Sequence, residues 1–219
     1  MSGIPDDGGS GPRHSTLIFV RHGETVWNTE GRWQGWLDSP LTERGRRQAE
    51  RAARRLANMA IDHAYCSDAG RAVETARILL EPHGLTATPV EHLRERYYGA
   101  HEGLDAGEIA ARHPGTRFAD SGMSRELWRP PGGETMAEVR ARVVAHVVQA
   151  AAAHPGRTIL NVTHSGVVRI MDSVCQGRPL EELWERHPPN LCVLIARVAD
   201  GRCEMIQDFM PNKSIAARK

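Results

Sequence analysis

Three polar clusters in this chain of 219 residues each follow a short apolar run. The clusters are Arg21-His22 after Thr16–Val20, Ser67 to Arg71 after His63–Cys66, and Thr163-His164 after Thr158–Val162. Such runs are typical of buried strands, and sites in open α/β sheets form outside the carboxyl ends of the strands. The sequence therefore predicts that two histidines and two arginines meet at one edge of a sheet.

This combination of side chains suits the transfer of a phosphoryl group. Arginine offers a fork of donors that fits phosphate oxygens, and an unprotonated histidine is a competent nucleophile. Charges on Arg21 and Arg71 should lower the pKa of His22 and keep it neutral. His164 can donate to the transferring oxygens, and Glu95 is the candidate acid for the leaving alkoxide. We therefore predict a phosphohistidine on His22.

Other chemistries fit the sequence less well. A metal site would need histidines or cysteines at ligand spacing, and the chain has no H-x-x-x-H or C-x-x-C motif. A serine hydrolase would carry G-x-S-x-G, but Thr163 stands where the first glycine before Ser165 belongs. Glycines 8, 9 and 11 follow no strand, which argues against a phosphate-binding loop.

Composition sets the class of protein. Hydrophobic residues make up 40% and charged residues 25%, which is typical of soluble globular proteins. A net charge of +1 argues against a nucleic-acid or membrane surface, and no apolar run is long enough for a membrane helix. The N-terminus lacks the apolar core of a signal peptide, and the four cysteines lack paired spacing. We expect a cytoplasmic protein with reduced, buried cysteines.

The elements that position the clusters alternate between strand and helix. Beyond the three strands, we expect a helix capped by Thr42, helices over Gly70–Leu80, Leu104–Arg112, Glu134–Ala153 and Val167–Cys175, and strands over Leu191–Val198 and Cys203–Asp208. This order predicts an α/β fold with a mainly parallel sheet and helices on both faces. Residues 94–133, which we call the cap segment, indicate an irregular insertion that could cover a site. We expect tails over 1–14 and 211–219 around one domain over 15–210.

Six blocks of the sequence resemble, in order, the signatures of the histidine phosphatase superfamily, the phosphoglycerate mutase-like proteins. They are RHGETVWN (Arg21–Asn28), GRWQGWLDSPLTERGRRQA (Gly31–Ala49), SDAGRAVETA (Ser67–Ala76), LRERYYGAHEG (Leu93–Gly103), PPGGE (Pro130–Glu134) and VTHSGVVR (Val162–Arg169). One such block would be weak, whereas six in order are specific. The resemblance implies a three-layer α/β/α sandwich with a cap inserted before its second half.

The resemblance also implies roles for the candidate residues. His22 would be the phosphorylated nucleophile, and Arg21, Arg71 and His164 would form the phosphate pocket. Glu95 would protonate the leaving group and then activate water. The candidate substrate contacts are Asn28, Gln34, Gly35, Tyr98 and Ser165. No metal or organic cofactor is expected for the phosphatases, the expected partner is a small phosphorylated metabolite, and a homodimer is consistent with many relatives.

Hydrolase and mutase differ in what accepts the phosphoryl group. The sequence around Tyr98 looks mutase-like, but Ala106 stands where the mutases carry a lysine. Arg125 and Arg129 are isolated, whereas the mutases have an adjacent arginine pair, and the closing tail of the mutases is not recognisable in Met210–Lys219. We therefore favour a phosphatase.

Two alternatives stay open. A mutase is the first, because arginines of the cap segment could supply the missing charge: Arg112, Arg117, Arg125 or Arg129. A catalytically silent scaffold is the second, and the presence of all five predicted catalytic residues argues against it.

Overall fold

The computed structural model describes residues 14–183, 187–199 and 202–209. The expected tails over 1–14 and 211–219 lie outside these ranges, apart from His14. Met210–Lys219, compared above with the closing tail of the mutases, also lies outside them.

A sheet of six described strands forms the centre of the protein, in the order β3-β2-β4-β1-β5-β6. The strands are β1 (Ser15–Arg21), β2 (His63–Ser67), β3 (Thr88–Val90), β4 (Thr158–Thr163), β5 (Val193–Ala199) and β6 (Arg202–Phe209). Pairing is parallel from β3 through β2 and β4 to β1, while β5 and β6 add antiparallel pairs. The predicted, mainly parallel sheet is therefore confirmed. Strand β3 was not predicted; it is a three-residue edge strand that contains Pro89.

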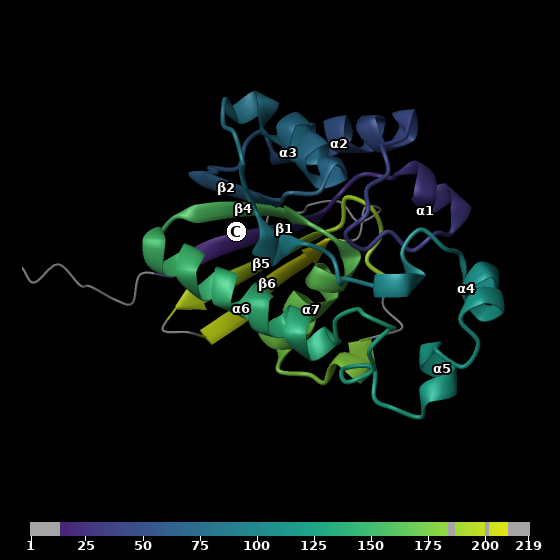
Figure 1. Ribbon diagram of the computed structural model, residues 1–219. Coiled ribbons are helices and arrows are strands. Elements are labelled where there is room, and N and C mark those ends of the chain that lie inside the picture. The colour runs from purple at the N-terminus through teal and green to yellow at the C-terminus, as the bar shows by residue number, and fades with distance from the viewer. Residues whose placement is uncertain (1–13, 184–186, 200–201, 210–219) are drawn as a thin grey trace, which may run out of the picture.

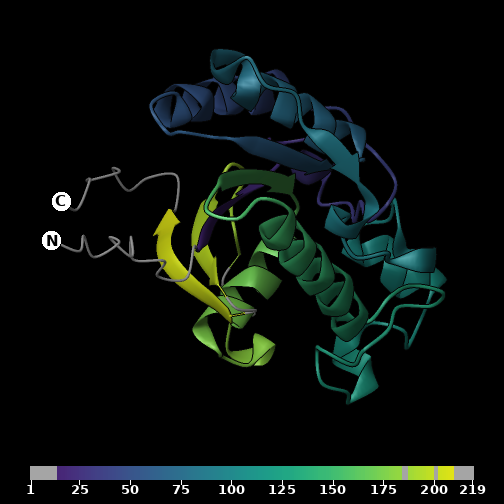
Figure 2. The same ribbon diagram turned by 90° about the vertical axis from the view of Figure 1, so that its left-hand side faces the viewer.

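Helices cover both faces of this sheet (Figures 1 and 2). On β1, Ile18 and Val20 pack toward α2 (Glu43–Leu56) and α3 (Gly70–Leu80). Leu17 and Phe19 pack on the opposite face, toward α6 (Met136–Ala153) and α7 (Ser165–Gln176). Successive side chains of a strand point to opposite faces, so one apolar strand supplies two cores. This is the expected three-layer α/β/α sandwich.

The main helices begin and end close to the predicted positions. Thr42 caps α2 as expected, since its hydroxyl accepts the amide of Gly45 at 2.9 Å. Thr135 and Glu138 form a capping box that starts α6 at Met136, two residues later than predicted. None of the described helices is long and apolar enough to cross a bilayer.

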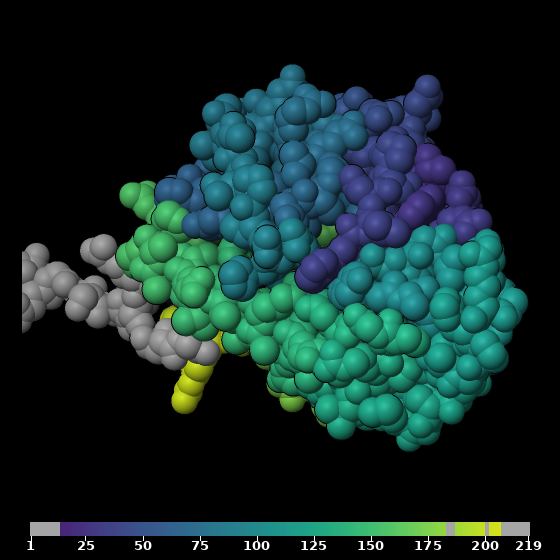
Figure 3. All heavy atoms as spheres, viewed as in Figure 1, coloured from purple at the N-terminus to yellow at the C-terminus, as the bar shows by residue number. Residues whose placement is uncertain are grey.

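The cap segment contains little regular structure. Besides η3 (Gly99–His101) it forms α4 (Ala106–Arg112), inside the predicted Leu104–Arg112, and a one-turn α5 (Phe118–Ser121) that the sequence did not predict. Near its ends the backbones are bonded to each other, because Ala100 donates to Pro131 at 2.9 Å and Glu134 donates to Tyr97 at 2.9 Å. In the space-filling view the teal atoms of the segment lie beside the purple residues that follow β1 and the green residues of α6 (Figure 3). Backbone hydrogen bonds therefore join the two ends of the segment to each other.

The remaining described elements are short. They are α1 (Val26–Glu30), η1 (Glu81–His83), η2 (Glu91–Leu93) and η4 (Leu180–Leu183). Two of these elements lie close to predicted site residues. His22 lies four residues before α1 begins, and Glu95 lies two residues after η2 ends.

The cysteine prediction was wrong for two of the four residues. Cys175, near the end of α7, forms a disulfide with Cys203 of β6, and the two Cα atoms lie 4.9 Å apart. The hairpin of β5 and β6 places β6 against α7, a contact that a sequence separation of 28 residues does not reveal. Cys66 and Cys192 are buried and not disulfide-bonded, as expected.

Candidate active site

The three predicted strand ends lie side by side. β1 and β4 pair in register so that Arg21 lies opposite Thr163, and β2 pairs with β4 on its other side. The amide of His22 donates to the carbonyl of Thr163 at 2.9 Å. As a result the rings of His22 and His164 meet edge to face, with centroids 5.2 Å apart.

A cavity of about 160 Å³ opens at this edge of the sheet. Its lining contains all ten predicted site residues together with two that were not predicted: Arg21, His22, Asn28, Arg32, Trp33, Gln34, Gly35, Arg71, Glu95, Tyr98, His164 and Ser165. The structure thus brings together residues from the ends of β1 and β4, the helices α1, α3 and α7, and the cap segment. No described group of three or more His, Cys, Asp or Glu residues is arranged to hold a metal ion.

His22 is buried and held in one tautomer. Its Nδ1 lies 2.7 Å from the carbonyl oxygen of Gly23, which can only accept, so Nδ1 carries the proton and Nε2 keeps its lone pair. Position 23 has no room for a side chain, because a Cβ there would lie 2.8 Å from the carbonyl oxygen of Gly45. Burial, followed by the charges of Arg71 and Arg21, holds the pKa of His22 well below its ordinary value. The neutral imidazole is the nucleophilic form.

Arg71 is 1% exposed and is fixed by oxygen acceptors. Its Nη1 donates to the Leu37 carbonyl at 2.8 Å and to Asp38 Oδ1 at 2.9 Å. Its Nη2 donates to the Gly35 carbonyl at 2.7 Å. Gly35 has a φ of +55°, and a Cβ there would lie 1.9 Å from Oε1 of Glu102, so only glycine fits.

His164 is held through its Nε2 atom. Its Nε2 lies 2.8 Å from Oγ of Ser67, and that oxygen already accepts the amide of Ala69 at 3.3 Å. A hydroxyl can donate one bond while it accepts another, so we assign the Ser67 hydroxyl as donor to Nε2 and the ring proton to Nδ1. Burial and then the charge of Arg71 hold the pKa of His164 well below its ordinary value.

Glu95 meets the first turn of α7. Its Oε2 accepts the amide of Gly166 at 3.1 Å and the hydroxyl of Ser165 at 3.3 Å, while Oε1 accepts the amide of Arg96 at 2.8 Å. A Cβ on Gly166 would lie 2.2 Å from Glu95 Oε1. The glycine that follows Ser165 is therefore what allows this carboxyl group to approach the helix.

Four cavity-lining residues have a buried polar atom without a hydrogen-bond partner among the described residues. They are Arg21 (Nε), Gln34 (Oε1), Arg71 (Nε) and His164 (Nδ1). A buried donor that stays unpaired costs about 1–3 kcal/mol, so most such groups have a partner. Three of the four are donors that surround His22. This arrangement suits an anion with several oxygen acceptors.

The other predicted contacts also have defined neighbours. Asn28 caps α1 with its Oδ1, which accepts the Thr25 amide and the side-chain amide of Asn190, both at 3.2 Å. Tyr98 packs edge to face against Trp33, with centroids 4.8 Å apart. Burial raises the pKa of the Tyr98 hydroxyl, which therefore stays protonated and able to donate.

Arg32 and Trp33 line the cavity but were not among the predicted site residues. Arg32 donates to the carbonyl of Gly103 at 2.7 Å, and it pairs with Glu108 at 2.5 Å and Glu30 at 3.0 Å. Both residues lie in the block GRWQGWLD, directly before the predicted Gln34 and Gly35. That position was the available signal.

The four arginines of the cap segment that could have added charge do not line the cavity. Their partners are Glu108 for Arg112, Asp120 for Arg117, the Phe118 ring for Arg125, and Glu138 with the Gly133 carbonyl for Arg129. These contacts lie within the cap segment and at the start of α6. Among the residues that the structure describes, Arg32 is the one lining arginine beyond Arg21 and Arg71.

Comparison with known proteins decides the family. A sequence model of the histidine phosphatase superfamily (branch 1) matches residues 17–207, which is most of the chain. The chain belongs to the histidine phosphatase superfamily. This confirms the resemblance of the six sequence blocks.

Relatives within the superfamily carry phosphatase and mutase names. Phosphoglycerate mutase-like protein 4 of Arabidopsis thaliana is 38% identical over 86% of this chain and 81% of its own. The structure of Bacillus stearothermophilus YhfR, 36% identical, covers 88% of this chain and 95% of its own with a TM-score of 0.80. A mycobacterial glucosyl-3-phosphoglycerate phosphatase, 32% identical, covers 87% and 96% with a TM-score of 0.76. The fold and the general activity of a phosphatase or mutase follow from this membership.

Proposed function

We propose that this protein hydrolyses phosphomonoesters of small metabolites through a phosphohistidine on His22. One observation carries the proposal: unpaired buried donors of Arg21, Arg71 and His164 surround a neutral His22 in one cavity. A phosphoryl group supplies acceptors for these donors and an electrophilic phosphorus for the imidazole.

In the first step, Nε2 of His22 attacks phosphorus and the bond from phosphorus to the ester oxygen breaks. The protonated carboxyl group of Glu95 gives its proton to the leaving oxygen, so that an alcohol departs. Arg21 and Arg71 neutralise the charge on the phosphoryl oxygens, and Nδ1 of His164 donates to one of them.

In the second step, the Glu95 carboxylate takes a proton from a water molecule. The water oxygen bonds to phosphorus, the bond from phosphorus to Nε2 of His22 breaks, and orthophosphate leaves. Both starting protonation states are restored, because Glu95 is again protonated and His22 is again neutral.

The distribution of charge supports water as the acceptor. A mutase must retain a phosphoglycerate, which needs cations for its carboxylate and second phosphate. In the described part of the chain, Arg32 is the lining arginine outside the proposed phosphate pocket, and it is already paired with Glu30 and Glu108. The arginines of the cap segment have their own partners and do not line the cavity.

A bisphosphoglycerate-primed mutase is the second candidate. The relative from Arabidopsis named as mutase-like favours it, and so does the position of Tyr98 in the cavity lining, three residues after Glu95. A silent scaffold is less well supported, since all five proposed catalytic residues line one cavity.

The cavity-lining residues outside the proposed catalytic set would select the substrate. We propose Asn28, Gln34, Gly35, Tyr98 and Ser165 as substrate contacts, with Trp33 as an aromatic wall. The relatives suggest sugar phosphates and phosphoglycerate derivatives for a first panel, because one of them is named as a glucosyl-3-phosphoglycerate phosphatase. The quantity to compare between compounds is kcat/KM.

The deciding experiment is a phosphatase assay with a chelator present. We expect hydrolysis of p-nitrophenyl phosphate at mildly acidic pH and none by His22→Ala. Bisphosphoglycerate-dependent conversion of 3- to 2-phosphoglycerate, fast relative to hydrolysis, would favour the mutase. No turnover of any phosphomonoester would favour the scaffold.

Two properties of the whole protein stay predictions. A homodimer is expected from the habit of relatives, and light scattering of the purified protein measures it. A cytoplasmic location is expected from the sequence, and cell fractionation tests it. The disulfide between Cys175 and Cys203 makes the second test informative, because such bonds are rare in the cytosol.

A further inference from the structure

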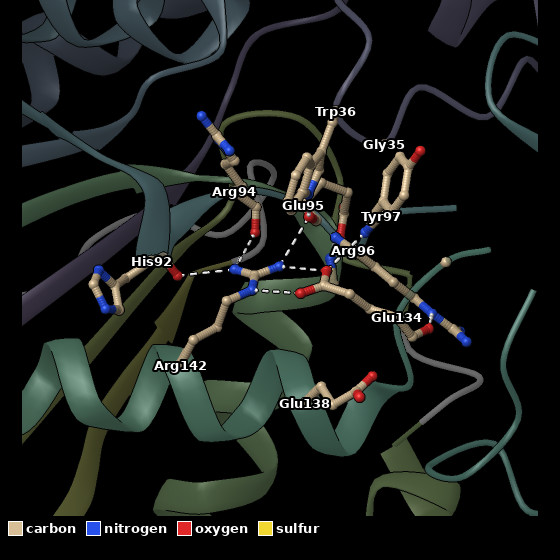
Figure 4. A network of polar contacts seen from close by, with 12 residues as sticks. Gly35, Trp36, His92, Arg94, Glu95, Arg96, Tyr97, Glu134, Glu138 and Arg142 are labelled. Atoms are coloured by element: carbon tan, nitrogen blue, oxygen red, sulfur yellow. Dashed lines mark hydrogen bonds and ion pairs between the residues drawn. The ribbon is translucent and has the colours of Figure 1, made fainter. Parts of the chain in front are cut away.

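Arg142 of α6 does not line the cavity, yet its guanidinium is directed at the segment that carries Glu95 (Figure 4). Nη1 donates to the carbonyl oxygens of His92 at 2.9 Å and Arg94 at 2.7 Å. Nη2 donates to the carbonyl of Glu95 itself at 2.9 Å. Three carbonyls within four residues are thus held by one side chain.

The remaining donors of Arg142 bind Glu134. Nε donates to Oε1 at 3.1 Å and Nη2 donates to Oε2 at 3.0 Å. An arginine has five N–H donors in a planar fork, and these contacts engage all of them. Arg142 and Glu134 are both less than one-fifth exposed, so this pair is partly shielded from solvent.

Glu134 also binds the backbone on the C-terminal side of Glu95, at Tyr97. Its Oε2 also accepts the amide of Tyr97 at 2.8 Å, and its own amide donates to the Tyr97 carbonyl at 2.9 Å. The carbonyl of Glu95 accepts a further bond from Nε1 of Trp36 at 3.0 Å. The backbone on both sides of Glu95 is therefore held by Arg142 of α6 and by Glu134, which lies just before this helix.

We propose that Arg142 and Glu134 form a positioning pair that sets the carboxyl group of Glu95 for proton transfer. This inference rests on the proposed role of Glu95 as acid and base. Proton transfer needs heavy atoms about 2.6–3.2 Å apart, and a misplacement of about 1 Å can cost about 100-fold in rate. The position of the carboxyl group depends on the backbone of Glu95. If that backbone shifts, the carboxyl group loses its contacts with Ser165 and Gly166 at the start of α7.

Lysine cannot replace arginine at this position. Its ammonium group has three donors around a point, whereas the contacts of Arg142 need five donors in one plane. Arg142→Lys keeps the positive charge but loses some of the hydrogen bonds to the backbone around Glu95 and to Glu134. Arg140→Lys is the matched control, because Arg140 lies on the same helix, is about half exposed and pairs with Glu126 at 3.2 Å.

The test compares substrates that differ in their need for an acid. p-Nitrophenolate leaves without protonation, whereas phenolate is far more basic and needs the proton from Glu95. We expect Arg142→Lys to lower kcat/KM about tenfold more for phenyl phosphate than for p-nitrophenyl phosphate. Glu95→Gln should show the same selectivity more strongly, and Arg140→Lys should show none.

A double variant separates positioning from a general loss of structure. If Arg142 acts through Glu95, adding Arg142→Lys to Glu95→Gln leaves the ratio of the two substrates unchanged. Glu134→Gln is the second variant. It should show the same selectivity between the two substrates, and it keeps the proposal testable if the Arg142→Lys protein folds poorly. Equal losses for both substrates, or a ratio that changes equally in both backgrounds, would overturn the proposal.

The two proposals fail in different ways. If Glu95→Gln shows no selectivity between the substrates, the role of Glu95 is wrong, and the positioning pair falls with it. If Glu95→Gln behaves as expected while Arg142→Lys and Glu134→Gln are unselective, only the positioning pair is wrong.

Discussion

Nδ1 of His22 donates its proton to the carbonyl oxygen of Gly23 across 2.7 Å. That bond decides which nitrogen could act as the proposed nucleophile, because a neutral ring with a proton on Nδ1 has its lone pair on Nε2. Gly23 is itself fixed, since its amide donates to Oγ1 of Thr75 at 3.0 Å and its Cα packs against Gly45. The main chain after β1 therefore orients the ring before any substrate binds.

The lowered pKa values of His22 and His164 predict how stability depends on pH. Below about pH 6.5 the unfolded chain binds protons that the folded histidines do not, so the free energy of unfolding falls as the pH falls. Each histidine contributes a slope of at most about 1.4 kcal/mol per pH unit. Urea unfolding at pH 7.5, 6.5 and 5.5, in buffers without phosphate, measures this slope.

A variant isolates the contribution of His22. His22→Gln should have a shallower slope than the wild type below pH 6.5, because it removes one histidine that is neutral when folded. An unchanged slope in His22→Gln would mean that His22 is protonated in the folded protein at these pH values.

Replacing Arg71 by lysine should reduce activity strongly. Lysine cannot contact Gly35, Leu37 and Asp38 together and still offer a donor to phosphate. Loss of one such donor typically costs about 100- to 1000-fold in rate, and we expect that loss in kcat/KM for Arg71→Lys. Arg77→Lys, on the exposed side of the same helix, is the control and should be fully active.

Gly35→Ala tests the support of Arg71. The new Cβ would collide with Oε1 of Glu102, which the amides of Trp36 and Tyr98 hold at 2.7 Å and 3.1 Å. We expect a loss of stability of about 1–3 kcal/mol together with reduced kcat/KM, because the Gly35 carbonyl binds Arg71. Thermal unfolding and p-nitrophenyl phosphate hydrolysis measure the two effects.

The matched control for this substitution is Gly122→Ala. Gly122 ends α5 with a φ of +63°, close to the +55° of Gly35, but a Cβ there meets nothing within 4 Å. It should lose about 1 kcal/mol from backbone strain alone and keep full activity. If both variants lose activity equally, contact with Glu102 is not the cause.

Strand ends made the centre of the site predictable. A strand is short and apolar, and parallel strands end at one edge, so His22, Arg71 and His164 could be grouped from local pattern alone. The placement of Glu95 depended on resemblance, because it lies in an irregular stretch after η2. Its contact with Gly166 joins residues that are 71 positions apart, which no local pattern reports.

The features that sequence missed depend on tertiary contacts. Arg32 lines the cavity because the segment after α1 pairs with the cap segment, where Trp33 donates to the Leu104 carbonyl at 3.0 Å. The disulfide of Cys175 and Cys203 likewise depends on where the last hairpin packs. Neither the contact of Trp33 with Leu104 nor the disulfide leaves a periodic pattern in the sequence.

If the phosphoryl group passes through His22, the variant Glu95→Gln should hold it there long enough to be measured. With p-nitrophenyl phosphate this variant should form the intermediate, because the leaving group needs no acid, and should hydrolyse it slowly, because water has no base. Rapid quenching and mass spectrometry of the peptide that contains His22 measure the product. We predict one acid-labile phosphoryl group on His22, absent from the same variant with His22→Ala. Release of p-nitrophenol with no phosphoryl group on the protein, or with the group on another residue, would contradict the account.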